Sequence, residues 1–357
     1  MKLDAITALL GDKNPWRKNP NSIWLASMVS LTRNLKKFKF PAKLSDERRK
    51  QVIELLASDL KKSSLLKNPQ LLLAEKVLPL EKEFLVEHFL TNQGFYQSSH
   101  GEAFMIDSTA EFLATFNLKD HLTLYWLDNR EELEATWEKV VRLEMELQDC
   151  SYAFHPKFGF LSADPATSGT GLTISIFLHL PALIHTDNFI EAVGKFKEES
   201  IEMMGLQGDP NELIGDIVLF QNVYRLGVTE EGLLTSLRTL AAKMVIEEKA
   251  MRSKLQANQG EMVIPLKDKV SRAFGVLLHS YQIEAIEALQ ALSLLKLGAD
   301  LNWIKGISQE ILNFALFNIR RAHLLCHYQE EKISPEEILH KRAEYIHRTL
   351  AGAELLI

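Results

Sequence analysis

A strict alternation of Leu or Ile with other residues in the middle of the chain constrains the fold more than any other feature. Leucine or isoleucine occupies every second position from Leu172 to Leu180, with Thr173, Ser175, Phe177 and His179 between them. The stretch from Leu122 to Trp126 alternates in the same way. Successive side chains of a β-strand point to opposite faces of the sheet, so both stretches predict half-buried strands. A purely helical fold is therefore excluded.

Segments with a helical repeat surround these strands. Ser45 and Thr229 each precede two acidic residues and a stripe of apolar residues at helical spacing, which predicts a helix start after each of them. Residues 133–147 carry a similar apolar stripe, and residues 216–225 predict a further strand. The first 255 residues are thus expected to be α+β.

The pattern changes after this point. Residues 256–267, with Gly260 and Pro265, lose the helical repeat and predict a linker. Residues 268–357 predict helices throughout, with a helix end at Gly298 and a helix start at Ser334, where Pro335 and two glutamates follow. The expected division is therefore 1–255, a linker at 256–267, and a helical domain at 268–357.

Charge and hydropathy exclude several classes of protein. The 41 Lys and Arg against 47 Asp and Glu give a net charge of −6, which argues against a nucleic-acid partner. No apolar run reaches the roughly 20 residues that cross a bilayer, and the first residues do not resemble a signal peptide. No membrane partner is therefore expected. Only Cys150 and Cys326 occur, which favours a reducing, cytoplasmic location.

The positive charge is concentrated near one end of the sequence. Residues 13–45 carry no acid and eight basic residues, so this segment has a charge of +8 and the remainder −14. A solvated surface is favoured over a binding surface for an acidic partner, because no stacking pattern of aromatic residues accompanies the charges. The basic residues are Lys13, Arg17, Lys18, Arg33, Lys36, Lys37, Lys39 and Lys43.

Short motifs stand in a consistent order and spacing over nearly the whole chain. They include Asn14-Pro15-Trp16, Leu31-Thr32-Arg33-Asn34-Leu35, Asp120-His121-Leu122, Phe158-Gly159-Phe160-Leu161, Gly169-Thr170-Gly171-Leu172 and Leu178-His179-Leu180-Pro181. Together these motifs resemble the bacterial protein-arginine kinases of the McsB type, relatives of the ATP:guanido phosphotransferases. The resemblance implies an antiparallel sheet wrapped by helices and a helical C-terminal domain that pairs two subunits. It also implies two kinds of protein partner, a small zinc-binding activator and the Clp unfoldase machinery.

The residues that carry the family's chemistry are largely replaced. The family transfers the γ-phosphoryl group of ATP to a guanidinium nitrogen, and its arginines hold the triphosphate through their planar forks of donors. All five arginine positions carry other residues here, and a histidine that contacts the nucleotide in the family corresponds to Phe89, beside His88. The arginine positions fall on Met28 and Ser30, which follow Ser27, and on Thr123, Thr173 and Met204; the degenerate nucleotide pocket also includes His121.

The acidic residues are also altered. A guanidinium group becomes nucleophilic only when a carboxylate orients it and accepts its proton. The resemblance places that acid in an Asn-Glu-Glu-Asp-His motif, which reads Asn117-Leu118-Lys119-Asp120-His121 in this chain. Asp209 is the only retained acid, at a position where the family has another carboxylate.

A second binding site of the family is reduced in the same way. The C-terminal motif Arg-Asp-x-x-Arg-Ala, which binds phosphoarginine in the family, retains only its second half at Arg342 and Ala343. A packing or surface role is favoured for Arg342 over contact with a ligand.

Other groupings carry weaker signals. His323, Cys326 and His327 have a spacing that zinc accepts, but no fourth ligand is evident, so no metal site is expected. The glycines at 169–171 lack the Lys of a phosphate-binding loop and precede a strand, which favours a structural role. Asp120 and His121 form an acid–base pair in sequence, but no nucleophile is placed beside them.

These observations lead to one expectation and two alternatives. We expect a protein-arginine-kinase homologue without kinase activity, a pseudokinase that requires no cofactor and acts as a regulatory or adaptor factor by binding proteins, as a homodimer through residues 268–357. The first alternative is an active, Mg-ATP-dependent protein arginine phosphotransferase in which Lys36, Lys37 or Lys119 reaches the phosphates. The second is a binding module for phosphoarginine or for an acidic partner.

Overall fold

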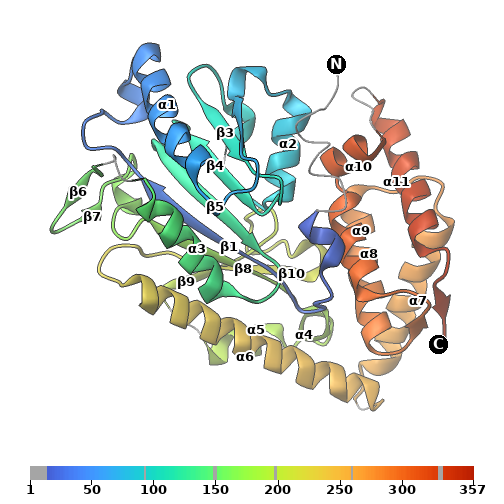
Figure 1. The fold of residues 1–357 in the computed structure, drawn as a ribbon. Coiled ribbons are helices and arrows are strands. Elements are labelled where there is room, and N and C mark those ends of the chain that lie inside the picture. Colours follow the sequence, from blue (N-terminus) through green and yellow to red (C-terminus); the bar gives the residue numbers. More distant parts are fainter. Residues whose placement is uncertain (1–13, 92–93, 148–150, 197–198, 259, 329–332) are drawn as a thin grey trace.

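A computed structural model describes residues 14–91, 94–147, 151–196, 199–258, 260–328 and 333–357. Its centre is an eight-stranded antiparallel sheet in the order β2-β3-β4-β5-β1-β8-β10-β9 (Figure 1). The antiparallel sheet expected from the family resemblance is therefore confirmed. The strands are β1 (Trp24–Arg33), β2 (Gln70–Leu73), β3 (Ala103–Ile106), β4 (Phe112–Phe116), β5 (Leu122–Asp128), β8 (Leu172–His179), β9 (Ile201–Gly205) and β10 (Ile217–Asn222).

The alternating stretches form two of the strands next to the sheet's centre, as predicted. β8 and β5 lie on either side of β1, and Ile174 and Ile176 of β8 are fully buried. β10 is shorter than the predicted 216–225. At the end of β10 the Asn222 side chain donates to the Leu172 carbonyl and accepts from the Ile174 amide. These two bonds to β8 replace the backbone hydrogen bonds that a longer strand would form.

Three helices cover one face of the sheet. A continuous apolar core forms between this face and residues such as Leu56 of α1, Val140 of α3 and Leu237 of α6. Thr229 accepts from the Gly232 amide, which confirms the predicted helix start. The helices are α1 (Asp46–Lys62), α3 (Leu133–Met145) and α6 (Glu230–Gln256), with the short α4 (Pro181–His185) and α5 (Phe189–Lys195) beside α6.

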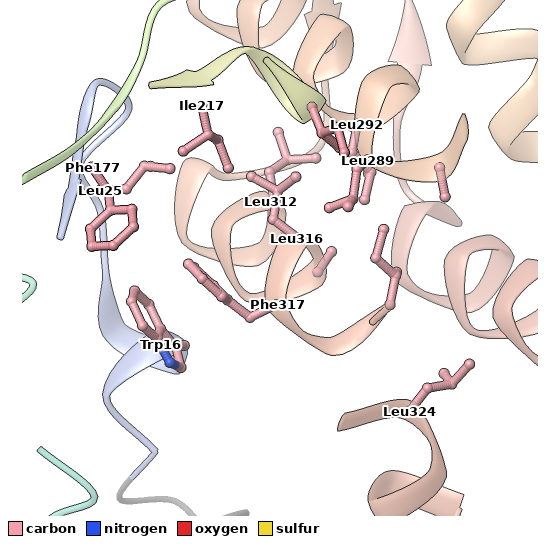
Figure 2. Close-up of a cluster of buried hydrophobic side chains, with 14 of the residues drawn as sticks. Trp16, Leu25, Phe177, Ile217, Leu289, Leu292, Leu312, Leu316, Phe317 and Leu324 are labelled. Carbon is pink, nitrogen blue, oxygen red and sulfur yellow. The ribbon is translucent and has the colours of Figure 1, made fainter. Parts of the chain in front are cut away.

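The C-terminal helices pack against one end of the opposite face. Figure 2 shows Leu25, Phe177 and Ile217 from the sheet in one buried cluster with Leu312 and Phe317. Trp16, in the short helix η1 (Pro15–Lys18), stacks on Phe317 with ring centroids 3.6 Å apart. The sheet and the C-terminal helices therefore share a hydrophobic core.

The helices on this side are α2 (Pro79–His88), α7 (Val263–His279), α8 (Ala285–Asp300), α9 (Gln309–Asn318), α10 (Arg321–Tyr328) and α11 (Pro335–Leu350). Ser334 accepts from the Glu337 amide, which confirms the predicted start of α11. Two-stranded ribbons are formed by β6 (Phe154–His155) with β7 (Gly159–Phe160) and by β11 (Ile304–Lys305) with β12 (Glu354–Leu355). Among the described residues, no helix combines the length and apolar character that a membrane crossing requires.

Two predictions about helix boundaries are wrong. The helical pattern resumes at Val263 rather than after 267, because Pro265 lies in the first turn of α7, where its missing N–H is tolerated. Gly298 does not end α8, which continues to Asp300. A Cβ at Gly298 would lie 2.8 Å from Val270 Cγ1, so this glycine allows α7 and α8 to approach closely.

His88, at the end of α2, is fully buried where the sheet region meets α10. Its Nε2 lies 2.9 Å from the Ala110 carbonyl oxygen, and its ring lies 5.7 Å from that of His323. Burial, the largest cause, lowers the pKa of His88 to about 3, and the neighbouring His323 acts in the same direction. The folded protein therefore holds this imidazole neutral.

This burial predicts acid sensitivity. His88 is protonated near pH 6.5 in the unfolded chain but only near pH 3 in the folded protein. The free energy of unfolding should therefore fall by up to about 1.4 kcal/mol for each pH unit below pH 6.5. His88→Gln keeps a donor for the Ala110 carbonyl and should flatten this slope in urea denaturation between pH 6.5 and 4. The matched change at the exposed His155, His155→Gln, should leave the slope as it is. An unchanged slope for His88→Gln would contradict the assignment.

Candidate functional site

A cavity of about 310 Å³ lies on the face of the sheet opposite α1, α3 and α6. Its walls come from neighbouring strands and include all five positions at which the family resemblance expects arginine. Those positions are Met28 and Ser30 of β1, Thr123 of β5, Thr173 of β8 and Met204 of β9.

The strand register explains why residues so distant in sequence meet here. Ser30 lies directly opposite Thr173 of β8, and Thr32 lies opposite Thr123 of β5. Because side chains alternate along a strand, Met28, Ser30 and Thr32 all point to the same face. Arginines at the five positions would therefore converge on one ligand.

The side chains that are present form a neutral surface. The hydroxyl oxygens of Thr32 and Thr123 lie 3.3 Å apart, and the Ser30 hydroxyl donates to the Thr173 carbonyl at 3.3 Å. The Ser175 hydroxyl donates to Gln221 Oε1 at 2.7 Å. These polar groups bond to one another, and Met28 and Met204 add apolar surface between them.

Two cations line the cavity in the described part of the chain. Lys119 Nζ lies 3.2 Å from Asp164 Oδ2, so its charge is offset at the surface. Arg225 follows β10 and donates from Nε to the Thr173 hydroxyl at 2.9 Å, with no carboxylate oxygen of the described residues within 4.0 Å. Burial lowers the pKa of Arg225, although Glu202 and Asp164 act against this shift.

Arg225 belongs to none of the motifs that carry the family resemblance. It lies within the segment 216–225 that the sequence predicts as a strand, but only the pairing of β10 with β8 brings it to the cavity. Lys36 and Lys37, which the sequence suggested as alternative contacts for the phosphates, do not line the cavity.

Four other candidate residues lie elsewhere. Ser27 points to the opposite face of β1 and accepts from the Trp24 indole at 2.9 Å. Phe89 and His88 are fully buried in the core between the sheet and α10. His121 accepts the Leu35 amide at Nδ1 and donates from Nε2 to the Lys39 carbonyl, and burial lowers its pKa. Its two ring nitrogens are therefore committed to holding the segment after β1.

Of the two candidate acids, one lines the cavity and the other does not. Asp120 lines it, but its Oδ1 accepts from the Asn34 amide group at 2.6 Å and from the Ala163 backbone amide at 2.7 Å. Asp209 is exposed after β9, where Oδ1 accepts from the Asn211 amide at 2.8 Å, and it is not among the lining residues.

The glycines at 169–171 have the structural role that the sequence favoured. A Cβ at Gly169 would lie 2.0 Å from the Arg225 carbonyl oxygen, and one at Gly171 would lie 2.6 Å from the Thr32 carbonyl oxygen. Both glycines also have positive φ angles, of 135° and 70°. They allow backbone segments to approach each other closely at the edge of the cavity.

Arg342 is a packing residue in the helical domain. It is 3% exposed, and it donates from Nε to the Ile319 carbonyl and from Nη1 to the Ile283 carbonyl, each at 2.8 Å. The guanidinium therefore joins the end of α9 to the segment before α8, with two of its donor nitrogens engaged.

The His and Cys residues of α10 also have structural surroundings. His323 Nδ1 lies 2.8 Å from Glu87 Oε2, and burial raises the pKa of Cys326 to about 12, which keeps its thiol protonated. No group of three or more potential metal ligands occurs in the described ranges. Cys150 lies outside those ranges.

The basic segment does not form one continuous surface. Arg33 is buried, forms an ion pair with Glu144, and stacks over Phe160 at 3.5 Å. Lys18 lines a different cavity, on the far face of the sheet. Lys36, Lys37, Lys39 and Lys43 contribute to the outer surface, and Lys13 lies outside the described residues.

Comparisons with known proteins agree with this architecture. The family model "ATP:guanido phosphotransferase, C-terminal catalytic domain" matches residues 50–251, and "Protein-arginine kinase McsB C-terminal domain" matches residues 263–355. A protein-arginine kinase of Chlamydia pneumoniae is 36% identical over 341 residues, 93% of each chain. A protein-arginine kinase of Halothermothrix orenii is 31% identical over 91% of this chain and 92% of its own. The crystal structure of a lombricine kinase matches the fold with a TM-score of 0.57 at 17% identity, over 68% of this chain and 70% of its own.

The surroundings of Arg342 predict a loss of stability when it is replaced. Arg342→Met should lower the free energy of unfolding by about 2 to 4 kcal/mol, because two charge-assisted bonds to buried carbonyl groups disappear. Urea denaturation measures this change. Arg348→Met, which removes an exposed arginine paired with Glu344 on the same helix, should cost less than about 0.5 kcal/mol. Equal effects of the two substitutions would contradict the packing role.

Proposed function

Since the chain belongs to the protein-arginine kinase family of ATP:guanido phosphotransferases, we propose that it is a catalytically degenerate member that acts by binding proteins. The observation that carries this proposal is the charge of the cavity. Its lining cations are Lys119, which pairs with Asp164, and Arg225, while Asp120 contributes a negative charge. A nucleotide triphosphate carries several negative charges and requires more compensation than this.

Magnitudes support the loss of nucleotide binding. A hydrogen bond to a charged group contributes roughly 1.5 to 3 kcal/mol, so five arginines would together contribute about 7 to 15 kcal/mol before non-additivity. Binding with a Kd of about 1 μM corresponds to only about 8 kcal/mol. Hydroxyl groups that already bond to each other, and two methionines, do not replace that contribution.

The proton-transfer chemistry is weakened as well. Leu118 and Lys119, at positions where the family resemblance expects glutamates, both line the cavity, so a hydrocarbon and a cation stand there in place of acids. The nearby carboxylate of Asp120 is held by two hydrogen bonds at one oxygen. Among the lining residues that the structure describes, Asp120 is thus the one carboxylate left for proton transfer, where the family resemblance expects two glutamates as well.

The surface around the cavity supports a role in protein binding. Tyr224 and Leu226, on either side of Arg225 in the sequence, are 54% and 50% exposed. The Arg225 carbonyl accepts from the Thr170 amide, and Arg225 lines the cavity, so these two side chains lie near its edge. Phe154 and Phe158 of the β6–β7 hairpin are also exposed, at 56% and 43%. Exposed aromatic and apolar groups are typical of protein interaction surfaces.

The proposed partners follow the family resemblance. We expect a homodimer through the helical domain at residues 268–357, and an activator-type zinc-binding protein or the Clp machinery as candidates for the regulated partner. In this proposal the chain is a cytoplasmic regulatory or adaptor factor that needs no cofactor.

A second function is favoured by one specific observation. Arg225 is a half-buried cation without a carboxylate partner in the described ranges, and it lies in the cavity beside Thr173. Together with Lys119 it offers two cations to a phosphate chain. The alternative is therefore weak Mg-ATP-dependent phosphotransfer in a rearranged site.

The proposal predicts no phosphoarginine product. Incubation of the full chain with Mg-ATP and an arginine-rich protein, followed by mass spectrometry of the protein, should show no phosphoarginine above a control without enzyme. Asp209→Ala should give the same result, because Asp209 does not reach the cavity. Phosphoarginine that forms with the unaltered chain and disappears with Asp209→Ala would overturn the proposal.

Calorimetry with Mg-ADP separates the two candidate functions. If Arg225 anchors a nucleotide, Arg225→Gln should weaken the affinity at least tenfold, whereas the degenerate cavity predicts no binding that depends on this residue. Arg238→Gln, at an exposed arginine on α6, is the matched control. A tenfold loss confined to Arg225→Gln would show that a nucleotide binds in this cavity, which the alternative requires and the degenerate cavity excludes.

A further inference from the structure

A second and larger cavity lies on the other face of the sheet. Its volume is about 560 Å³, within the range of small-molecule sites. Trp126 of β5 lines it, whereas the preceding residue, Tyr125, lines the degenerate cavity on the opposite face. The other walls come from η1, the loop after α1, the β3–β4 turn, the loop after β5 and α3.

Positive charge dominates this cavity. Lys18, Lys67, Arg130 and Lys139 line it, against one carboxylate, that of Glu111, so the lining residues sum to +3. Glu111 forms an ion pair with Arg130, whose charge is thereby offset. Three lysines thus remain, whereas the lysine of the degenerate cavity is paired with Asp164.

The three lysines come from separate segments of the chain. Lys18 belongs to η1, Lys67 to the loop after α1, and Lys139 to α3. Lys18 and Lys67 have no carboxylate oxygen within 4.0 Å among the residues that the structure describes, and Lys139 Nζ lies 5.5 Å from the centroid of the Trp126 ring. A concave site lined by one sign of charge concentrates ions of the opposite sign.

The remaining lining favours recognition of charge over recognition of an aromatic base. Trp126 is only 4% exposed, so its ring face is not free for stacking. The Thr109 hydroxyl donates to Asp107 and the Asn129 amide group donates to the Pro15 carbonyl, so these polar groups hold the walls in place. Ser108 lines the cavity beside the lysines, whose ammonium groups pair with phosphate oxygens and donate hydrogen bonds to them.

We propose that this cavity binds a compact polyanion of linked phosphate groups, through Lys18, Lys67 and Lys139. The site is independent of the proposed function, because it lies on the other face of the sheet and uses none of the positions where the family resemblance expects arginine. The ligand chemistry is that of a diphosphate or triphosphate chain, either free or as part of a nucleotide.

Calorimetry with inorganic tripolyphosphate tests the proposal on the full chain. Saturable binding should weaken about tenfold in Lys18→Gln and in Lys67→Gln, and the affinity should fall as salt rises, because each lysine contributes a screened charge contact. Both lysines are exposed, so their replacement should leave the fold intact, which thermal unfolding checks. Lys43→Gln, an exposed lysine of the same basic segment that does not line the cavity, should bind tripolyphosphate like the unaltered chain.

A second arm uses ATP without magnesium to distinguish the two sources of phosphate. An affinity within about threefold of that for tripolyphosphate would identify the phosphate chain as the recognised group, and a tighter ATP complex that still depends on Lys18 would identify a nucleotide. The absence of saturable binding, or equal binding by Lys18→Gln, Lys67→Gln and Lys43→Gln, would overturn the proposal. Binding lost only in Arg225→Gln would also overturn it, since the ligand would then lie in the other cavity. None of these outcomes depends on phosphoarginine formation, so this proposal and the proposed function can fail separately.

Discussion

Holding a polyanion in a concave protein site has an electrostatic cost, and what this fold can bind depends on how that cost is met. A phosphate chain leaves water only where protein cations and donors replace its hydration. In this fold the positions that would supply those cations lie on the same face of β9, β8, β1 and β5. Ser30 of β1, for example, lies directly beside Thr173 of β8. With hydroxyl and thioether groups at those positions, the cavity keeps its shape, and under the proposed function it carries too little positive charge for phosphoryl transfer.

The fold tolerates this change because the two faces of a strand are independent. Met28 and Ser30 face the cavity, while Val29 and Leu31, between and after them, are fully buried against the helices on the other side. Substitution on the cavity face therefore leaves the main core of α1, α3 and α6 intact. The core shared with the C-terminal helices, where Trp16 stacks on Phe317, includes the buried Met28, and Met204 packs against it, so two of the replaced positions contribute apolar contacts to that core.

Much of this arrangement could be predicted from the sequence, but only where the signal is local. The alternation in β8, the cap at Thr229 and the cap at Ser334 depend on neighbouring residues and are confirmed. Gly298 lies inside α8 and does not end it, because its small size allows α7 to approach α8 closely. This requirement arises from tertiary packing and leaves no local signal in the sequence.

The same limit applied to the candidate site. The resemblance identified the replaced arginine positions, and the register explains their convergence. The two hydrogen bonds of the His121 ring, the carbonyl contacts of Arg342 and the place of Arg225 arise from segments distant in sequence. The cavity beside Trp126 combines five such segments, and no sequence motif indicates it.

A crystal structure determined with Mg-ADP at several millimolar tests whether the cavity with the replaced arginine positions holds a nucleotide, because it locates any bound nucleotide. The account predicts no ordered nucleotide between Ser30, Thr173 and Arg225, whatever is bound on the other face of the sheet. An ADP molecule ordered in that cavity, with its phosphates neutralised by the side chains that line it, would contradict the account.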